Sequence, residues 1–168
     1  NVNVVGIQLT LGLGSVSLTG NIDQTITLPS FFGASYLNNP HVTGALETFA
    51  ITVVGGNPSN HPYYNFGSSN KFAINGSTAT FAVTLNLYEG STYKFDQSDS
   101  SNSGHPLRFS TTANGTHGGG SEYTTGVTTN GTPGSAGAYT QITVASGAPT
   151  LYYYCTNHSG MGWTANTL

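Results

Sequence analysis

Charged side chains are scarce in this sequence. Three Lys and Arg and six Asp and Glu account for 5% of its 168 residues, and the formal net charge is −3, whereas about 25% of residues are charged in an average domain. Proteins that bind nucleic acid neutralise phosphates with clustered Lys and Arg, so three scattered cations predict no nucleic-acid partner. The same scarcity argues against an anionic membrane as a partner. We therefore expect a protein that binds neither nucleic acid nor membrane.

Long apolar runs, helical periodicity and cysteine pairs are also missing. No apolar run approaches the roughly 18 residues that a membrane span requires, and nowhere do apolar residues recur with a helical period. The single cysteine, Cys155, excludes an internal disulfide framework. The chain starts at Asn1 without a leader-like segment, so we expect a processed product or a piece of a longer protein. A folded core must therefore come from β-strands without disulfide support.

The residues that are abundant indicate folded β-structure. Thr, Gly, Ser and Asn make up close to half of the chain, but ten Tyr and eight Phe are more aromatic surface than a disordered chain carries. Apolar and polar residues alternate in short runs, which is typical of half-buried strands. This pattern predicts an all-β fold, either a sandwich or a Greek-key barrel. In the C-terminal part, strands are expected at residues 49–53, 72–74, 81–87, 93–95, 107–109, 142–144 and 151–155.

Two regions differ in their patterning. Residues 1–45 begin with short alternating runs and end, over residues 29–45, in a stretch of Pro, Gly and Asn without periodicity. We expect an N-terminal β segment and linker over residues 1–45, with a role in assembly, and one β-domain over residues 46–168. Within that domain, residues 111–137 are dense in Thr, Gly and Asn and are predicted to be rich in loops.

The residues with metal-binding chemistry are concentrated in one short segment. Residues 151–161 hold the only cysteine, Cys155, a histidine, His158, and the only methionine, Met161, at spacings of three residues. A soft thiolate, an imidazole and a weak thioether on one loop suit copper, which takes one Cys and two His in a plane with a weak axial Met. A copper site of this kind requires a second histidine from another part of the chain.

Two histidines that precede a proline are candidates for this second imidazole. His105 lies at the junction of a turn with a strand whose Leu107 and Phe109 alternate into the core. Pro106 would hold that junction extended. His61 also precedes a proline, but it lies close to the start of the domain, so we expect it to be a loop residue. His105 is therefore the preferred ligand.

The segment 151–161 resembles the ligand loop of the cupredoxins, the blue-copper family of plastocyanin and amicyanin, and its Cys-x-x-His-x-x-Met spacing is most similar to that of amicyanin. Residues 83–95 resemble the family's strand, acidic-Gly turn and strand upstream of the first ligand. The resemblance covers residues 46–168 and implies a cupredoxin-like Greek-key β-sandwich that can bind copper. The order of ligands in the family implies four metal ligands here, namely His105, Cys155, His158 and Met161.

Two features depart from the cupredoxin pattern. Cupredoxins continue into a final core strand after the Met, but only seven residues follow Met161. We therefore expect the closing strand to be short, absent or supplied by a neighbour. The 45 residues at the N-terminus have no counterpart in a small electron carrier, and they suggest an attachment function.

A second resemblance concerns the type of protein. Residues 98–112 and 151–162, together with the N-terminal strand pattern, resemble segments of structural proteins predicted in marine bacteriophages. In those proteins a cupredoxin-like module ends a Thr/Gly-rich β-chain. The resemblance implies a virion surface protein, either a fibre or a capsid or tail decoration. Such a protein would be found on the virion or outside the cell and would bind copies of itself or other virion proteins.

Several alternatives to this interpretation are open. The main one is a secreted blue-copper electron-transfer protein with the same four ligands. Another is an ordinary sandwich in which the thiol and the Met are simply buried and no metal binds. A sugar-binding adhesive module is hinted at only by the Tyr and Asn content. Residues 117–120, His-Gly-Gly-Gly, imitate an esterase oxyanion loop, but no Gly-x-Ser-x-Gly motif accompanies them. We expect no enzyme activity, and we expect His41 and His117 to be solvated loop residues.

Overall fold

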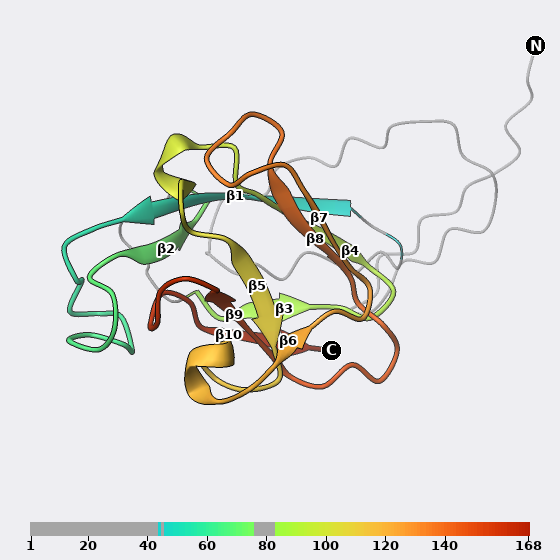
Figure 1. Ribbon diagram of the computed structural model, residues 1–168. Helices are drawn as coiled ribbons and strands as arrows, with labels where there is room; N and C mark the ends of the chain where they lie inside the picture. The colour runs from blue at the N-terminus through green and yellow to red at the C-terminus, as the bar shows by residue number, and fades with distance from the viewer. Residues whose placement is uncertain (1–43, 45, 76–82) are drawn as a thin grey trace, which may run out of the picture. The chain divides into compact units, whose positions relative to one another are not determined.

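The computed structural model describes residues 44, 46–75 and 83–168 (Figure 1). The chain separates into two units, Asn1–Val42 and Thr43–Leu168, and every described residue belongs to the second unit. The β segment and the assembly role predicted for residues 1–45 therefore fall, apart from residue 44, outside the described residues.

The second unit is a sandwich of two mixed five-stranded sheets. Their strand orders are β2-β1-β4-β8-β7 and β3-β10-β9-β5-β6. This confirms the predicted all-β sandwich. The described residues form no α-helix, and no helix among them has the length and apolarity to cross a membrane. The elements are β1 (Leu46–Val54), β2 (Lys71–Ile74), β3 (Leu85–Leu87), β4 (Thr92–Asp96), η1 (Ser100–Asn102), β5 (Leu107–Ser110), η2 (Gly115–Gly118), β6 (Glu122–Tyr123), β7 (Val127–Asn130), β8 (Tyr139–Thr143), β9 (Leu151–Cys155) and β10 (Thr164–Thr167).

The core lies between the two sheets and is built from alternate residues of the strands. In β4, Tyr93 and Phe95 are buried while the residues beside them are only half-buried, as expected for a strand with one face on the core. The ring of Phe95 packs against Phe109 of β5, in the opposite sheet, with centroids 5.2 Å apart. Within the first sheet, Phe49 of β1 is the cross-strand partner of Phe95, and their ring centroids are 5.3 Å apart. The contact between Phe95 and Phe109 therefore joins the two layers.

The predicted loop-rich stretch, residues 111–137, also contains η2 and the short strands β6 and β7. Each of these strands is at the edge of its sheet. Their side chains are exposed or half-buried, so they carry no apolar alternation. β6 and β7 form because their backbones pair with β5 and β8. Strands of this kind cannot be predicted from apolar periodicity in the sequence.

The closing strand after the ligand loop is short and comes from the chain itself. β10 has four residues and lies between β3 and β9 in its sheet. Its Ala165 is fully buried and pairs with Leu85 on one side and Leu151 on the other. The residues between β9 and β10 are therefore held at both ends by a central pair of strands.

Candidate metal centre

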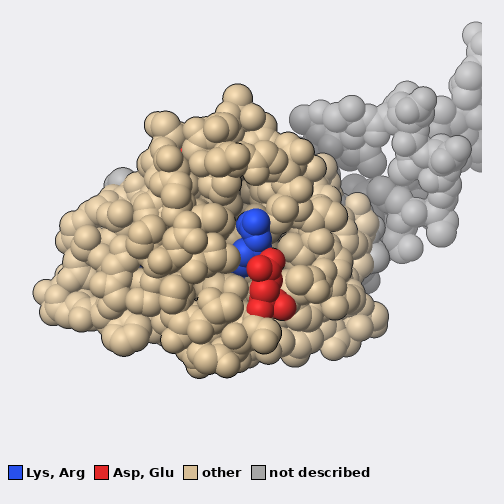
Figure 2. Space-filling view, in the orientation of Figure 1, with Lys and Arg blue, Asp and Glu red and all other residues tan. Residues whose placement is uncertain are grey.

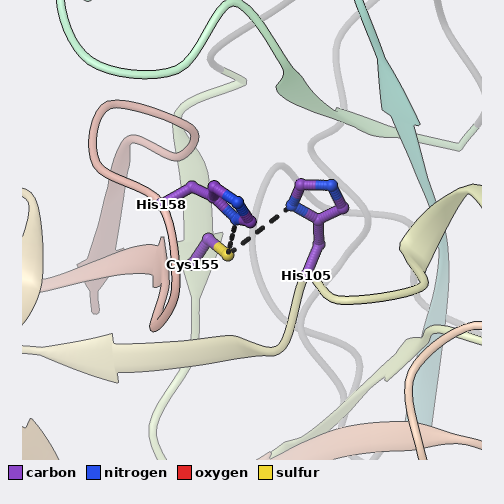
Figure 3. A group of neighbouring side chains, drawn as sticks. All are labelled: His105, Cys155 and His158. Atoms are coloured by element: carbon purple, nitrogen blue, oxygen red, sulfur yellow. Dashed lines mark hydrogen bonds between the residues drawn. The ribbon is translucent and has the colours of Figure 1, made fainter.

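The pairing of β5 with β9 brings His105 and Cys155 together. Leu107 lies opposite Cys155 in this antiparallel ladder, and His105 comes two residues before Leu107. Because Cys155 is the last residue of β9, the two side chains meet at the same end of the sheet. His158 follows in the loop to β10, and its ring faces the Cys155 sulfur (Figure 3).

These three side chains form a group that could hold a metal ion. The Nδ1 atoms of His105 and His158 lie 3.8 and 3.7 Å from the Cys155 Sγ, and the three ligand atoms lie within 4.8 Å of one another. Metal–nitrogen bonds of about 2.0 Å and metal–sulfur bonds of about 2.3 Å put such atoms roughly 3.5–3.8 Å apart at tetrahedral or trigonal angles. The observed separations therefore fit one shared metal ion.

The group is buried on one side and open on the other. Cys155 is fully buried and His105 is 7% exposed, whereas His158 is exposed. The two imidazole rings lie close together, with centroids 4.5 Å apart. A metal bound here would be enclosed around its sulfur ligand, while solvent or a partner would reach it at the His158 edge.

Two buried amides hold the backbone that carries His105. The Gln97 side chain donates to the carbonyl of His105 at 2.8 Å and accepts from the N–H of Leu107 at 3.0 Å. The Asn102 side chain accepts from Gln97 and donates to the carbonyl of Ile51 in β1. Gln97 and Asn102 are 1% and 0% exposed, so these bonds do not compete with water. Sequence analysis missed both residues, because no local pattern marks an amide as buried.

The ligand loop, residues 156–163, is held by side-chain bonds from neighbouring segments. Asn157 donates to the carbonyl of Gly104, beside His105. The N–H of Gly160 donates to the side chain of the buried Asn114 at 2.7 Å. These bonds fix the loop on both sides of the group, which limits how far His158 can move.

Met161 is placed in the protein interior at the end of the ligand loop. It is 1% exposed and belongs to the core between the sheets. Its carbonyl accepts from the N–H of Phe72, the second residue of β2, at 2.9 Å. Its side chain is therefore on the protein side of the loop. The metal-binding role of Met161 stays a prediction.

Burial shifts the protonation of two of the three residues. It raises the pKa of the Cys155 thiol, and the backbone N–H groups of Asn157 and His158 offset this rise in part. Burial, with a smaller contribution from His158, lowers the pKa of His105. The free group thus favours a protonated thiol and a neutral imidazole. A metal ion would have to displace the thiol proton, so its binding should release protons.

The other two described histidines, His61 and His117, lie outside this group. His61 is in the connection between β1 and β2, as predicted, but it is only 2% exposed. Its Nδ1 accepts from the N–H of Tyr63, and its Nε2 makes no hydrogen bond of good geometry with a described residue. His117 is exposed in η2, as expected, with its Nε2 3.1 Å from the carbonyl oxygen of Cys155. His41 lies outside the described residues.

We expect the buried His61 to make the metal-free protein sensitive to acid. Burial and the nearby charge of Lys71 lower the pKa of His61 from 6.5 to about 4. Between these values the unfolded chain binds a proton that the folded chain does not, so the free energy of unfolding falls as the pH falls. The full loss is about 3 kcal/mol, at about 1.4 kcal/mol per pKa unit. Urea unfolding of the wild type and of His61→Gln at pH 7 and 4.5 measures it. Equal losses in both proteins would contradict the assignment to His61.

No protein-family model matches the chain, and searches of curated proteins and of solved structures returned no significant match.

Proposed function

We propose that residues 46–168 form a copper-binding module of the blue-copper type, in which His105, Cys155 and His158 would hold the ion and Met161 would be a weak fourth ligand. The observation that carries this proposal is the convergence of both imidazole Nδ1 atoms on the Cys155 sulfur. Thiolate and imidazole ligands suit copper, whereas Mg²⁺, Ca²⁺ and Mn²⁺ prefer oxygen. Bound copper would supply a one-electron redox couple.

The surrounding residues support this role by restraining the ligands. Gln97 and Asn102 fix the backbone at His105, and Asn114 fixes the ligand loop. A ligand set restrained in this way changes little when the charge at its centre changes. Rapid electron transfer requires that the ligands move little between the two oxidation states. Residues that orient metal ligands through hydrogen bonds commonly affect the affinity and reduction potential of the metal.

Copper titration of the purified full chain, followed by visible absorption, tests the proposal. We expect an intense band that saturates at one copper per chain, because thiolate and Cu²⁺ together absorb in the visible range. Zn²⁺ is d¹⁰ and fits the same ligands, so it should suppress the band without giving colour. A colourless protein that loses its copper on dialysis would refute the assignment.

We propose further that the module is carried by a structural protein of a virion surface. The low proportion of charged residues, 5% of the chain, supports this. On the face in Figure 2, Lys, Arg, Asp and Glu atoms appear in one patch over β5 and β6, and Arg108–Glu122 is the one ion pair among the described residues. The edge strand β7 pairs only with β8 and bears no charge. Uncharged edges readily pair with further chains, so copies of this protein can associate there.

The size of the assembly in solution tests this association. We expect the full chain to sediment as an oligomer, and Thr129→Lys on β7 to weaken it, because an exposed charge on an edge strand opposes pairing. Ser135→Lys adds the same charge at an exposed loop position and should leave the oligomer intact. A wild type that stays monomeric at high concentration would contradict the assembly role.

A secreted electron-transfer protein is the alternative, and the exposure of His158 favours it. An exposed ligand offers an edge through which an electron can reach a partner protein. Both proposals use the same copper site and neither involves enzyme activity. Mass spectrometry of purified phage particles separates them, because only the virion protein would be found there in stoichiometric amounts.

A further inference from the structure

Lys71 is a buried lysine with no acidic partner among the described residues. It begins β2 and is 0% exposed, although lysine is almost never fully buried unless it is paired. Its Nζ donates to four backbone carbonyls, at 3.0 Å to Tyr63, 3.2 Å to Phe66, 2.7 Å to Ser68 and 2.6 Å to Gly160. These acceptors replace the water that the ammonium group has lost.

The four carbonyls belong to two segments that meet at Lys71. Three lie in the connection between β1 and β2. The fourth is in the ligand loop, at Gly160, two residues after His158 and one before Met161. The same two segments are also joined by a backbone bond from Ser68 to Ser159 at 2.9 Å. Lys71 therefore ties the ligand loop to the connection between β1 and β2.

The chemistry of the contacts indicates that Lys71 is charged. An ammonium group has three protons to offer to four carbonyls, whereas a neutral amine has two and would turn its lone pair toward an acceptor. Burial lowers the pKa of Lys71, and no carboxylate contributes to that shift. Its positive charge is thus uncompensated by any described acidic residue. The electrostatic field of this charge is weakly screened in the protein interior, where the effective dielectric constant is lower than in water.

We propose that Lys71 is a positioning residue of the metal centre: its four hydrogen bonds hold the loop that carries His158, and its charge favours the less positive oxidation state of the bound metal. The effect on the metal rests on the proposed copper site. The effect on the loop does not depend on any metal, so the two can be measured separately.

Lys71→Met in the full chain removes both the charge and the hydrogen bonds. We expect the ratio of Cu(I) to Cu(II) affinity to fall about tenfold, which is a reduction potential lower by about 59 mV for a one-electron couple. Lys94→Met is the matched control. It removes the same charge from a half-buried lysine that lies over the Tyr139 ring, and its potential should equal that of the wild type.

Hydrogen exchange of the metal-free proteins tests the positioning role. The N–H of Gly160, bonded to Asn114, and that of Phe72, bonded to the Met161 carbonyl, report opening of the ligand loop. Both should exchange at least about tenfold faster in Lys71→Met and at the wild-type rate in Lys94→Met. Wild-type exchange in Lys71→Met would overturn the positioning role.

Two further variants keep the proposal falsifiable if Lys71→Met does not fold. Lys71→Gln retains hydrogen-bond donors without the charge, so its potential should fall while its loop exchange stays closer to that of the wild type. Lys71→Arg retains the charge and should restore the potential. Equal potentials in Lys71→Gln and the wild type would overturn the effect of the charge. A wild type that binds no copper would instead refute the proposed function, and exchange alone would then decide the role of Lys71.

Discussion

Replacing Cys155 with serine is expected to abolish the visible band of the copper-loaded protein. The sulfur is fully buried and is the atom toward which both imidazole Nδ1 atoms point. A serine hydroxyl stays protonated at neutral pH and is a poor ligand for copper, which favours soft thiolate. The absorption that a thiolate gives with Cu²⁺ should therefore disappear, and copper should be lost on dialysis.

The fold should survive this change, because serine is close to cysteine in shape and its hydroxyl can hydrogen-bond the Nδ1 atom of His105 or His158. Thermal unfolding of the metal-free variant checks this. His117→Gln serves as the control, since its amide can still donate to the Cys155 carbonyl that His117 reaches. It should keep the colour. An intense band in Cys155→Ser would show that the thiolate is not the ligand.

Gly162→Ala is expected to cost about 3 kcal/mol of folding free energy. A Cβ at Gly162 would overlap the carbonyl oxygen of Tyr153 and lie 2.7 Å from its carbonyl carbon. That contact is with backbone of the central strand β9, which cannot move aside. The end of the ligand loop must shift instead and displace Met161, so copper affinity should also fall by about tenfold. Urea unfolding and copper competition measure the two losses.

Gly147→Ala provides the comparison for this variant. Gly147 has a φ of +69°, but a Cβ there would meet nothing within 4 Å. Gly147→Ala should lower the folding free energy only by the strain of an alanine in the left-handed region, about 1 kcal/mol. Its copper affinity should equal that of the wild type. Equal losses in the two alanine variants would show that the close approach at Gly162 does not matter.

The pairing of Cys155 with His158 could be predicted from local spacing, and His105 could be preferred from its turn-to-strand junction, but its position beside the sulfur needed the fold. Cys155 and His158 are three residues apart, so one loop necessarily brings them near each other. His105 and His61 both precede a proline, and only the β5–β9 register puts His105 beside the sulfur. His61 is buried in the connection between β1 and β2, away from the three-residue group. The metal and the virion role stay predictions.

The residues that hold the site could not be predicted. Gln97, Asn102 and Lys71 are polar residues buried by segments far away in the sequence. A polar side chain looks the same in a sequence whether it faces water or backbone carbonyls. The strands β6 and β7 were hidden for a related reason, since they are made by backbone pairing and not by an apolar stripe.

The sequence by itself determined the all-β class, most of the core strands and the Cys155-x-x-His158-x-x-Met161 segment, because alternation and short spacing act within a few residues of chain. Only the tertiary structure decided the order of the strands in the two sheets and the register that puts His105 beside Cys155. It also decided that Lys71 and the buried amides are satisfied by carbonyls from distant segments. Pairing between strands and burial of polar groups depend on long-range contacts, and these contacts leave no local pattern in the sequence.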